Sequence, residues 1–238
     1  MDLQQIEDFF VDSGGQFVTS AFNIRERLAN IRAFVYDWDG VFNDGRKGVS
    51  AQSDFTEVDS MGTNMLRYAH YRQGQNLPLT AVITGEINPS AEKWVAREHI
   101  DCLYGNAKNK SDALAHFCAQ FDLEPRQVAY FYDDLLDIPV AQAVGLRFAV
   151  GRLANPVFIS YLEQNGLADY ISATQGNEHA VREFSELLLA LYGEAFEIFK
   201  QRADYSEDYR QYLAQRQNRS SRIFEFNNDE INEREPKF

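Results

Sequence analysis

Five short apolar runs, separated by segments of helical pattern, constrain the fold of this chain more than any other feature. Short, mostly apolar runs of this kind are typical of parallel strands that are buried on both faces, and the segments between them are long enough for helices. This alternation predicts a Rossmann-like α/β fold with a doubly wound parallel sheet. The five expected strands cover residues 33–36, 79–83, 102–104, 128–132 and 146–150.

Three regions are expected along the 238 residues. Residues 1–30 form an N-terminal helical extension, residues 31–191 form the α/β domain, and residues 192–238 form a C-terminal helical extension with a mobile tail. The tail begins near Ser220, where the sequence becomes polar and poor in residues that can pack. Helices are expected near residues 61–71, 89–98, 111–121, 138–144, 156–165 and 180–217.

The formal net charge of -13 limits the classes of partner. Such a surface repels nucleic-acid phosphates and anionic lipid head groups, so neither nucleic acid nor a membrane is expected as a partner. No segment approaches the ~20 apolar residues of a membrane span, and the N-terminus lacks the pattern of a signal peptide. The expected location is therefore the cytoplasm. On such an acidic protein, a phosphate ester requires a binding site with local positive charge. A bound divalent metal ion is the simplest source of that charge.

Two acidic residues, Asp37 and Asp39, directly follow the first expected strand. A turn at this point, which Gly40 permits, would let both carboxylates approach one ligand. One carboxylate can then bind metal and attack phosphorus, while the other transfers a proton. The alternative interpretation is a solvated acidic turn, since such turns are common.

A second acidic cluster, Asp133, Asp134 and Asp137, follows the fourth expected strand. Three carboxyl groups within five positions repel one another unless a cation relieves them. Oxygen ligands of this kind are those that Mg²⁺ prefers. The alternative interpretation is a helix N-terminus enriched in Asp, which the helix dipole favours; it fits Asp137 better than Asp133.

Thr84 and Lys110 follow the second and third expected strands. The Thr84 hydroxyl and the nearby backbone N–H of Gly85 can bind a phosphate oxygen, and a lysine can neutralise a phosphoryl group or an attacking carboxylate. Lys108 is a rival for Lys110, and an ordinary surface lysine is the alternative for both. Ligands bind at the carboxyl ends of parallel strands. Four successive strands are each followed by residues that can bind phosphate or metal, and this favours a single binding site.

These four clusters resemble the four motifs of the haloacid dehalogenase superfamily. Within it, the chain is most similar to the 3-deoxy-D-manno-octulosonate 8-phosphate phosphatases and related sugar-acid phosphatases, over about residues 25–191. The stretches that carry the family resemblance are Asp39–Gly45, Asp133–Val140 and Ala180–Glu183. The superfamily motifs correspond here to Asp37–Val41, Val82–Gly85, Lys110 and Tyr132–Asp137.

The resemblance implies a Mg²⁺-dependent phosphatase that acts through an aspartyl-phosphate. Asp37 would be the nucleophile, and Asp39 would protonate the leaving oxygen and then activate water. Mg²⁺ would be held by Asp37, by the backbone carbonyl of Asp39 and by Asp133.

The same resemblance implies roles for the other matching residues. Thr84, Gly85 and Lys110 would position and neutralise the phosphoryl group. Asp134 and Asp137 would support the metal site. Phosphoryl transfer depends chiefly on positioning and charge neutralisation, which this set of groups supplies.

Three residues depart from the family pattern. Tyr132 replaces a glycine before the fourth motif, Glu86 stands where the sugar-acid phosphatases tend to have Arg, and Glu178 falls in their glycine-rich segment. Two added acids disfavour an anionic leaving group. A phosphatase for a nucleotide or another metabolite, and a non-catalytic oligomeric binding protein of the same fold, are therefore the alternative functions.

The 45 positions between Asp39 and Thr84 leave room for a hairpin and a helix but for no large cap domain. A small β-hairpin flap is expected near residues 45–57, after the first strand. Capless members of the superfamily are tetramers in which hairpins and tails cover a neighbour's site. The resemblance therefore implies a homotetramer, with residues 45–57 and the C-terminal tail as the covering segments.

Overall fold

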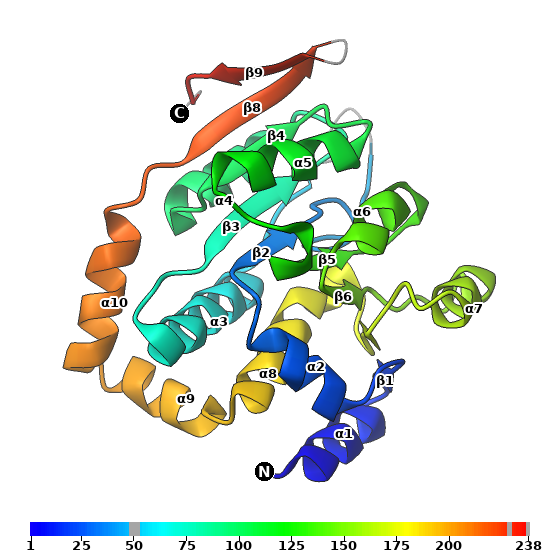
Figure 1. Ribbon diagram of the computed structural model, residues 1–238, viewed down its shortest axis with the longest axis vertical. Coiled ribbons are helices and arrows are strands. Elements are labelled where there is room, and N and C mark those ends of the chain that lie inside the picture. Colours follow the sequence, from blue (N-terminus) through cyan, green and yellow to red (C-terminus); the bar gives the residue numbers. More distant parts are fainter. Residues whose placement is uncertain (48–52, 228–229, 237–238) are drawn as a thin grey trace.

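The structure is a computed structural model that describes residues 1–47, 53–227 and 230–236. Within these residues one sheet has the strand order β1-β7-β6-β5-β2-β3-β4-β8-β9 (Figure 1). Its five central strands coincide with the apolar runs and are parallel, which confirms the predicted doubly wound α/β fold. The strands are β1 (Gln16–Phe17), β2 (Ala33–Tyr36), β3 (Leu79–Ile83), β4 (Cys102–Gly105), β5 (Val128–Tyr132), β6 (Leu146–Ala149), β7 (Tyr170–Ile171), β8 (Arg222–Asn227) and β9 (Glu230–Arg234).

Helices cover both faces of the sheet. Side chains alternate along β2, so that Phe34 and Tyr36 join one apolar core while Ala33 and Val35 join the other. Helices α1 (Leu3–Asp12), α2 (Ala21–Leu28), α4 (Pro89–Glu98) and α8 (Ala180–Tyr192) contribute to the first core. Helices α5 (Lys110–Gln120), α6 (Ile138–Ala143) and α7 (Pro156–Gln164) contribute to the second.

The carboxyl ends of the central strands meet at one edge of the sheet. Tyr36, at the end of β2, is paired with Val82 of β3 and Phe131 of β5. Residues that follow these strands therefore come together at this edge, where ligands bind in open α/β sheets.

Local capping signals explain where the helices near this edge begin. Asn88 accepts hydrogen bonds from the backbone N–H groups of Ser90 and Ala91 at the start of α4, and Pro89 occupies the first turn. Asn109 caps α5 in the same way. Lys110 is therefore the first helical residue of α5 and faces the end of the sheet.

Residues 45–57, where the hairpin flap is expected, lie partly outside the described residues, which omit 48–52. The described residues on either side, 41–47 and 53–56, contain no strand, and the flap stays a prediction. Between β2 and β3 the described chain holds one helix, α3 (Glu57–Gly74), and no further domain. The absence of a large cap agrees with the prediction.

The C-terminal region corrects one expectation. Three helices follow β7, namely α8, α9 (Ala195–Ala203) and α10 (Glu207–Gln217), and Gly193 ends α8 in the left-handed region with φ 82°. The chain then continues into β8, parallel to β4, and β9, antiparallel to β8. The prediction of a mobile tail from Ser220 is wrong for the described residues.

The reason is that β8 carries apolar side chains on both faces of the sheet, since Ile223 joins the first core and Phe224 joins the second. Ile223 and Phe224 are buried, and the Phe224 ring stacks on Tyr104 with centroids 5.0 Å apart. On the outer side, Arg222 pairs with Glu233 at 2.8 Å. These residues pair with their own sheet, and the expected role of the C-terminal tail in covering a neighbour's site stays a prediction.

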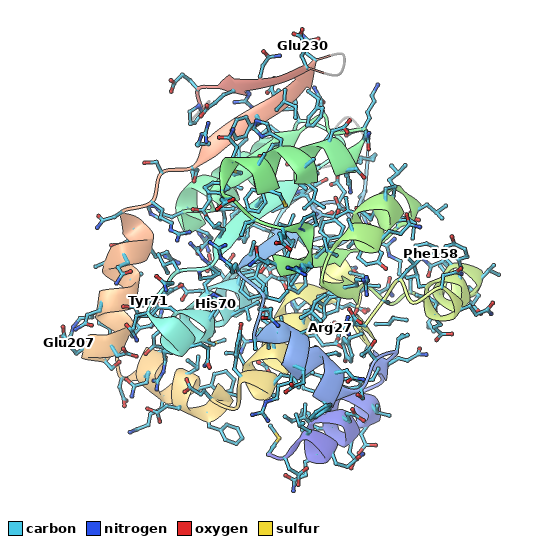
Figure 2. All side chains as sticks on the ribbon, viewed as in Figure 1. Arg27, His70, Tyr71, Phe158, Glu207 and Glu230 are labelled. Atoms are coloured by element: carbon cyan, nitrogen blue, oxygen red, sulfur yellow. The ribbon has the colours of Figure 1, made fainter. Side chains whose placement is uncertain are left out.

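The outer surface carries most of the charge. Glu207 on α10 and Glu230 at the start of β9 point outward at the periphery of the molecule (Figure 2). Among the described residues no helix combines the length and the hydropathy that crossing a bilayer requires.

Candidate active site

Asp37 lies where β2 ends, in the centre of the sheet. Its backbone N–H donates to the carbonyl of Phe131 at 2.9 Å, and the residue is 4% exposed. The chain then turns sharply, because Gly40 adopts φ +89° and the buried Trp38 indole donates to the carbonyl of Ser53 at 3.0 Å. The turn that Gly40 was expected to permit is therefore present.

A buried cluster of acids surrounds Asp37. Carboxylate oxygens of Asp37, Asp133 and Asp137 lie within 4.8 Å of one another. Burial, the Asp137 carboxylate and the Asp133 carboxylate raise the pKa of Asp37 well above its usual range, although Lys110 opposes them. Burial likewise raises the pKa of Asp133 to about 6, against the lowering effect of Arg152. This set of carboxylate oxygens fits a hard divalent cation such as Mg²⁺.

Lys110 is the cation at the centre of this cluster. Its Nζ lies 2.6 Å from Oδ1 of Asp37 and 2.6 Å from Oδ1 of Asp137. Burial alone would lower the pKa of Lys110, but the two carboxylates outweigh it and raise the pKa above its ordinary value. Lys108, the rival in sequence, is exposed.

The acids after β5 divide into two roles. Asp137 is 1% exposed and accepts hydrogen bonds from Lys110 and from the Tyr130 hydroxyl. Asp134 is exposed, and its carboxylate accepts from the Leu135 N–H at 2.7 Å. The carboxylate of Asp134 is therefore outside the cluster. The sequence also allowed Asp137 to be an acidic residue at a helix N-terminus. In the structure, Asp134 is the residue that caps the short helical turn that follows.

Thr84 follows β3 and offers a buried hydroxyl. The residue is 1% exposed, and its Oγ1 has no hydrogen-bond partner among the described residues. Buried hydroxyls are normally paired, so an unpartnered one at a strand end indicates a ligand. Gly85 follows, and a Cβ at this position would meet no atom within 4 Å, so the space beside it is open.

Asp39 faces the mouth of the site rather than the acidic cluster. Its Oδ2 lies 2.6 Å from Nζ of Lys47, which is also 3.0 Å from Oε2 of Glu86. Its Oδ1 is buried and has no partner among the described residues. The Asp39 side chain therefore has one oxygen, Oδ1, that can accept a hydrogen bond from a ligand.

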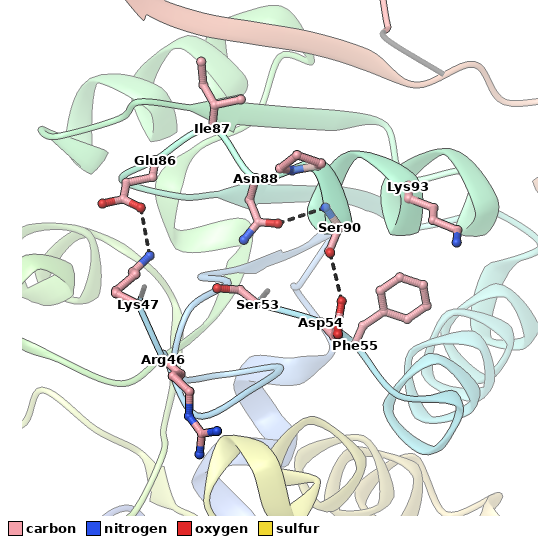
Figure 3. Close-up of a pocket in the computed structure, with 11 residues that line it drawn as sticks. Arg46, Lys47, Ser53, Asp54, Phe55, Glu86, Ile87, Asn88, Ser90 and Lys93 are labelled. Carbon is pink, nitrogen blue, oxygen red and sulfur yellow. Dashed lines mark hydrogen bonds and ion pairs between the residues drawn. The ribbon is translucent and has the colours of Figure 1, made fainter. Parts of the chain in front are cut away.

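A cavity of about 790 Å³ opens beside Lys47 and Glu86 (Figure 3). Figure 3 shows the Lys47 amine directed toward Glu86, while Arg46 points away from it and Lys93 lies toward the opposite end. The lining also includes Asn88, Ser53 and Phe55. The cavity has the size of a small-molecule pocket, ~300–1,000 Å³.

Two residues of this region were missed in the sequence. Arg152 follows β6, and its Nη2 lies 2.6 Å from Oδ2 of Asp133 and donates to the Gly40 carbonyl at 3.1 Å. Lys47 was expected only as part of a hairpin tip. A signal for Arg152 was present, because it lies two residues beyond the fifth apolar run and thus near the same sheet edge.

The departures from the family pattern lie in different places. Tyr132 points into the second core, where its hydroxyl donates to the Leu167 carbonyl at 2.8 Å. Glu178 is exposed and accepts from the Gln175 N–H at 3.1 Å. Gly176 is packed so closely that a Cβ would lie 2.2 Å from the Asn43 carbonyl. Of the three departures, Glu86 is the one that lines the cavity.

Comparison with known proteins finds similar sequences among the 3-deoxy-D-manno-octulosonate 8-phosphate phosphatases. A 3-deoxy-D-manno-octulosonate 8-phosphate phosphatase, KdsC, from Escherichia coli is 33% identical over 180 residues, which cover 72% of this chain and 86% of the relative. No family model matches the chain.

Two solved structures extend the similarity to the fold. The 3-deoxy-D-manno-octulosonate 8-phosphate phosphatase from Yersinia pestis has a TM-score of 0.59 at 30% identity, covering 73% of this chain and 89% of that chain. The cobalt-bound deoxy-D-mannose-octulosonate 8-phosphate phosphatase (YrbI) from Haemophilus influenzae has a TM-score of 0.61 at 26% identity, covering 73% and 99%.

Proposed function

This chain belongs to the 3-deoxy-D-manno-octulosonate 8-phosphate phosphatase family of the haloacid dehalogenase superfamily, and from that premise we propose that it hydrolyses 3-deoxy-D-manno-octulosonate 8-phosphate with Mg²⁺ as cofactor. The predicted resemblance and the predicted class, a phosphoric monoester hydrolase, are confirmed by this membership. One observation carries the proposal for the site: Lys110 lies 2.6 Å from Asp37 within a buried carboxylate cluster at the sheet edge.

Asp37 is the nucleophile in the proposed reaction. Its carboxylate oxygen forms a bond to phosphorus while the bond from phosphorus to the ester oxygen of the substrate breaks. Lys110 keeps a positive charge beside Asp37, which favours the ionised carboxylate despite burial. The pair is fixed by the fold before substrate arrives, so no reorganisation is needed during the reaction.

Asp39 transfers the protons. It donates one to the departing ester oxygen, and in the second half of the reaction it takes one from the water that attacks the aspartyl-phosphate. Its buried Oδ1, unpartnered among the described residues, is free to make these contacts. Inorganic phosphate leaves and Asp37 is regenerated.

The metal site comprises the carboxylates of Asp37 and Asp133 together with the backbone carbonyl of Asp39. A bound Mg²⁺ there neutralises charge on the transferring phosphoryl group. The cluster of buried oxygens and the cobalt bound by the relative from Haemophilus influenzae both support a divalent cation. Asp137 supports this site by holding Lys110, and Asp134 supports it by shaping the loop.

Phosphate binding falls to three groups at the neighbouring strand ends. The Thr84 hydroxyl needs a partner that the protein does not supply within the described residues. The backbone of Gly85 faces open space, and Lys110 adds positive charge. These groups suit the oxygens of a phosphoryl group, which are all hydrogen-bond acceptors.

The leaving group would occupy the cavity beside Asp39. A second substrate class is favoured by one observation there, because Glu86 places a carboxylate in the lining. A phosphate ester with a neutral leaving group, such as a nucleotide that releases its nucleoside, is therefore the alternative substrate. All the residues of the proposed reaction are in place, which argues against a non-catalytic binding protein.

We also propose a homotetramer located in the cytoplasm. The family resemblance supports the tetramer, and large apolar side chains exposed after β5 and β6 support a contact between subunits; they are Leu135, Leu136, Leu153 and Val157. Light scattering during gel filtration is expected to give four times the chain mass of 27.3 kDa. A monomer in that measurement would contradict the tetramer.

A steady-state assay of phosphate release tests the proposed activity. Hydrolysis of 3-deoxy-D-manno-octulosonate 8-phosphate is expected with Mg²⁺ and is expected to disappear when the metal is chelated. A panel of nucleotides, neutral sugar phosphates and an aryl phosphate identifies the substrate class. Activity on the panel but not on the sugar acid would favour the alternative substrate, and no activity on any ester would contradict the proposal.

A further inference from the structure

Arg152 makes a contact that links two parts of the site. It follows β6, and its Nη2 lies 2.6 Å from Oδ2 of Asp133, which itself follows β5. The same nitrogen donates to the carbonyl of Gly40, in the turn after β2, at 3.1 Å. One guanidinium nitrogen therefore joins three neighbouring strand ends.

The packing at this point is close. A Cβ at Gly40 would lie 2.0 Å from Oδ2 of Asp133 and 2.4 Å from Nη2 of Arg152. Non-bonded atoms do not approach one another this closely. Only glycine at position 40 therefore lets the backbone of the turn contact the Asp133 carboxylate and the Arg152 guanidinium. The turn after β2 is thus shaped to receive the Asp133–Arg152 pair.

Arg152 is a second cation that contacts the cluster of three carboxylates. Lys110 contacts Asp37 and Asp137, and Arg152 contacts Asp133. The side chain of Asp133 is 8% exposed and that of Arg152 is 22% exposed. Removing a cation from such a pair leaves a buried carboxylate without its partner, which is unfavourable.

We propose that Arg152 is a positioning residue for the divalent cation. It fixes the Asp133 carboxylate against the turn after β2, and the residue before Gly40 in that turn, Asp39, supplies the backbone carbonyl of the proposed metal site. Two of the three protein ligands are thereby held in place before the cation binds. The inference rests on the proposed metal site and not on the identity of the substrate.

Calorimetric titration of metal-free protein with Mg²⁺, in the absence of substrate, tests this role. Arg152→Met is expected to weaken Mg²⁺ binding by about 10- to 100-fold, the usual effect of removing a group that orients a metal ligand. Arg152→Lys keeps the charge beside Asp133 but lacks the planar fork of donors, so it is expected to recover only part of the affinity.

Arg27→Met is the matched control. Arg27 forms a partly buried pair with Asp169 at 2.5 Å, outside the acidic cluster, so its loss is expected to leave the Mg²⁺ affinity unchanged. Circular dichroism shows whether each variant is folded, and the Lys variant supplies the comparison if the Met variant unfolds. Unchanged or tighter Mg²⁺ binding by folded Arg152→Met, or by folded Arg152→Lys where the Met variant does not fold, would overturn the proposal.

The experiment separates this inference from the proposed function. A wild-type protein that binds Mg²⁺ but hydrolyses no phosphate ester contradicts the proposed activity alone. The comparison of dissociation constants between wild type and the Arg152 variants is independent of that result.

Discussion

The two sides of the site differ in burial and in how their charges are held. On the phosphoryl side, the side chains of Asp37, Asp133 and Lys110 are each at most 8% exposed and in direct ion pairs. On the leaving-group side, the side chains of Lys47 and Glu86 are 50% and 67% exposed. The first side matches the family motifs, and the second departs from them at Glu86.

This difference has a physical reason. A buried charge without a partner is so costly that the acids and cations of the phosphoryl side must stay matched. Exposed ion pairs contribute little to stability, so residues at the mouth can change without loss of the fold. We infer that the phosphoryl side determines the reaction and that the mouth determines which ester is cleaved.

The largest expected effect is at Asp37. Asp37→Asn keeps the shape of the side chain but removes the attacking oxygen, and kcat is expected to fall by at least about 10⁴-fold, as for loss of other enzyme nucleophiles. Phosphate release from an aryl phosphate, which does not depend on the natural leaving group, measures this. A variant with more than a tenth of wild-type kcat would break the assignment of the phosphoryl side.

Lys110→Met is expected to have the next largest effect. Loss of the charge beside Asp37 should lower kcat by about 10²–10³-fold, and the free energy of unfolding should fall by about 3–5 kcal/mol because a buried pair is broken. Denaturant titration and kinetics measure the two effects. Lys108→Met, which changes an exposed lysine two residues earlier, should match wild type in kcat and in the free energy of unfolding. An equal loss with Lys108→Met would contradict the assignment of Lys110 to the site.

The pH dependence of Mg²⁺ binding tests whether burial raises the pKa of a carboxyl group on the phosphoryl side. In the metal-free protein, burial raises the pKa of Asp133 to about 6. The cation needs the ionised carboxylate, so its affinity should fall by about tenfold per pH unit below that value. A titration series from pH 5 to 8 measures it, and a constant affinity across about pH 6 would be inconsistent with the account.

The same raised pKa has a consequence for stability. A carboxyl group whose pKa is higher in the folded state stabilises the fold when it is protonated. Metal-free protein should therefore lose stability as the pH rises from the usual value of 3.8 to about 6, and Mg²⁺ should restore it. Thermal unfolding with and without Mg²⁺ at each pH measures this. A loss of stability that Mg²⁺ reverses comes from ionisation of the metal site, whereas a general effect of pH would be the same with and without Mg²⁺.

The smallest expected effect is at the mouth. Glu86→Gln removes an exposed acid from the cavity, so KM for the anionic sugar-acid phosphate should fall by up to about fivefold, the range of an exposed charge pair. High salt should abolish the change, and Glu26→Gln, an exposed acid on α2, should have no effect. A large loss of kcat with Glu86→Gln would contradict the separation of the two sides.

Much of the site could be predicted because most of its residues directly follow strands of the sheet. Thr84, Lys110 and Asp133 follow apolar runs, and parallel strands bring such positions to one edge. The roles of these residues in catalysis remain proposals. Arg152 was missed as the partner of Asp133 because the two residues follow different strands, and a position near the sheet edge does not by itself indicate which residues pair.

Other differences come from local geometry that composition does not reveal. A short 3₁₀ turn, Leu135–Asp137, directs Asp137 inward and leaves Asp134 as the cap. The C-terminal residues are polar enough to resemble a mobile tail, yet Ile223 and Phe224 are buried where β8 pairs with β4. Two buried residues in so short a strand are a weak signal beside the polar residues around them.

Binding of beryllofluoride, which mimics the aspartyl-phosphate, tests most directly whether Asp37 carries the phosphoryl group. Fluorine NMR should show a bound species with wild-type protein only when Mg²⁺ is present, and no bound species with Asp37→Asn. Equal binding by the Asp37→Asn variant, or no binding by wild type with Mg²⁺, would contradict the account.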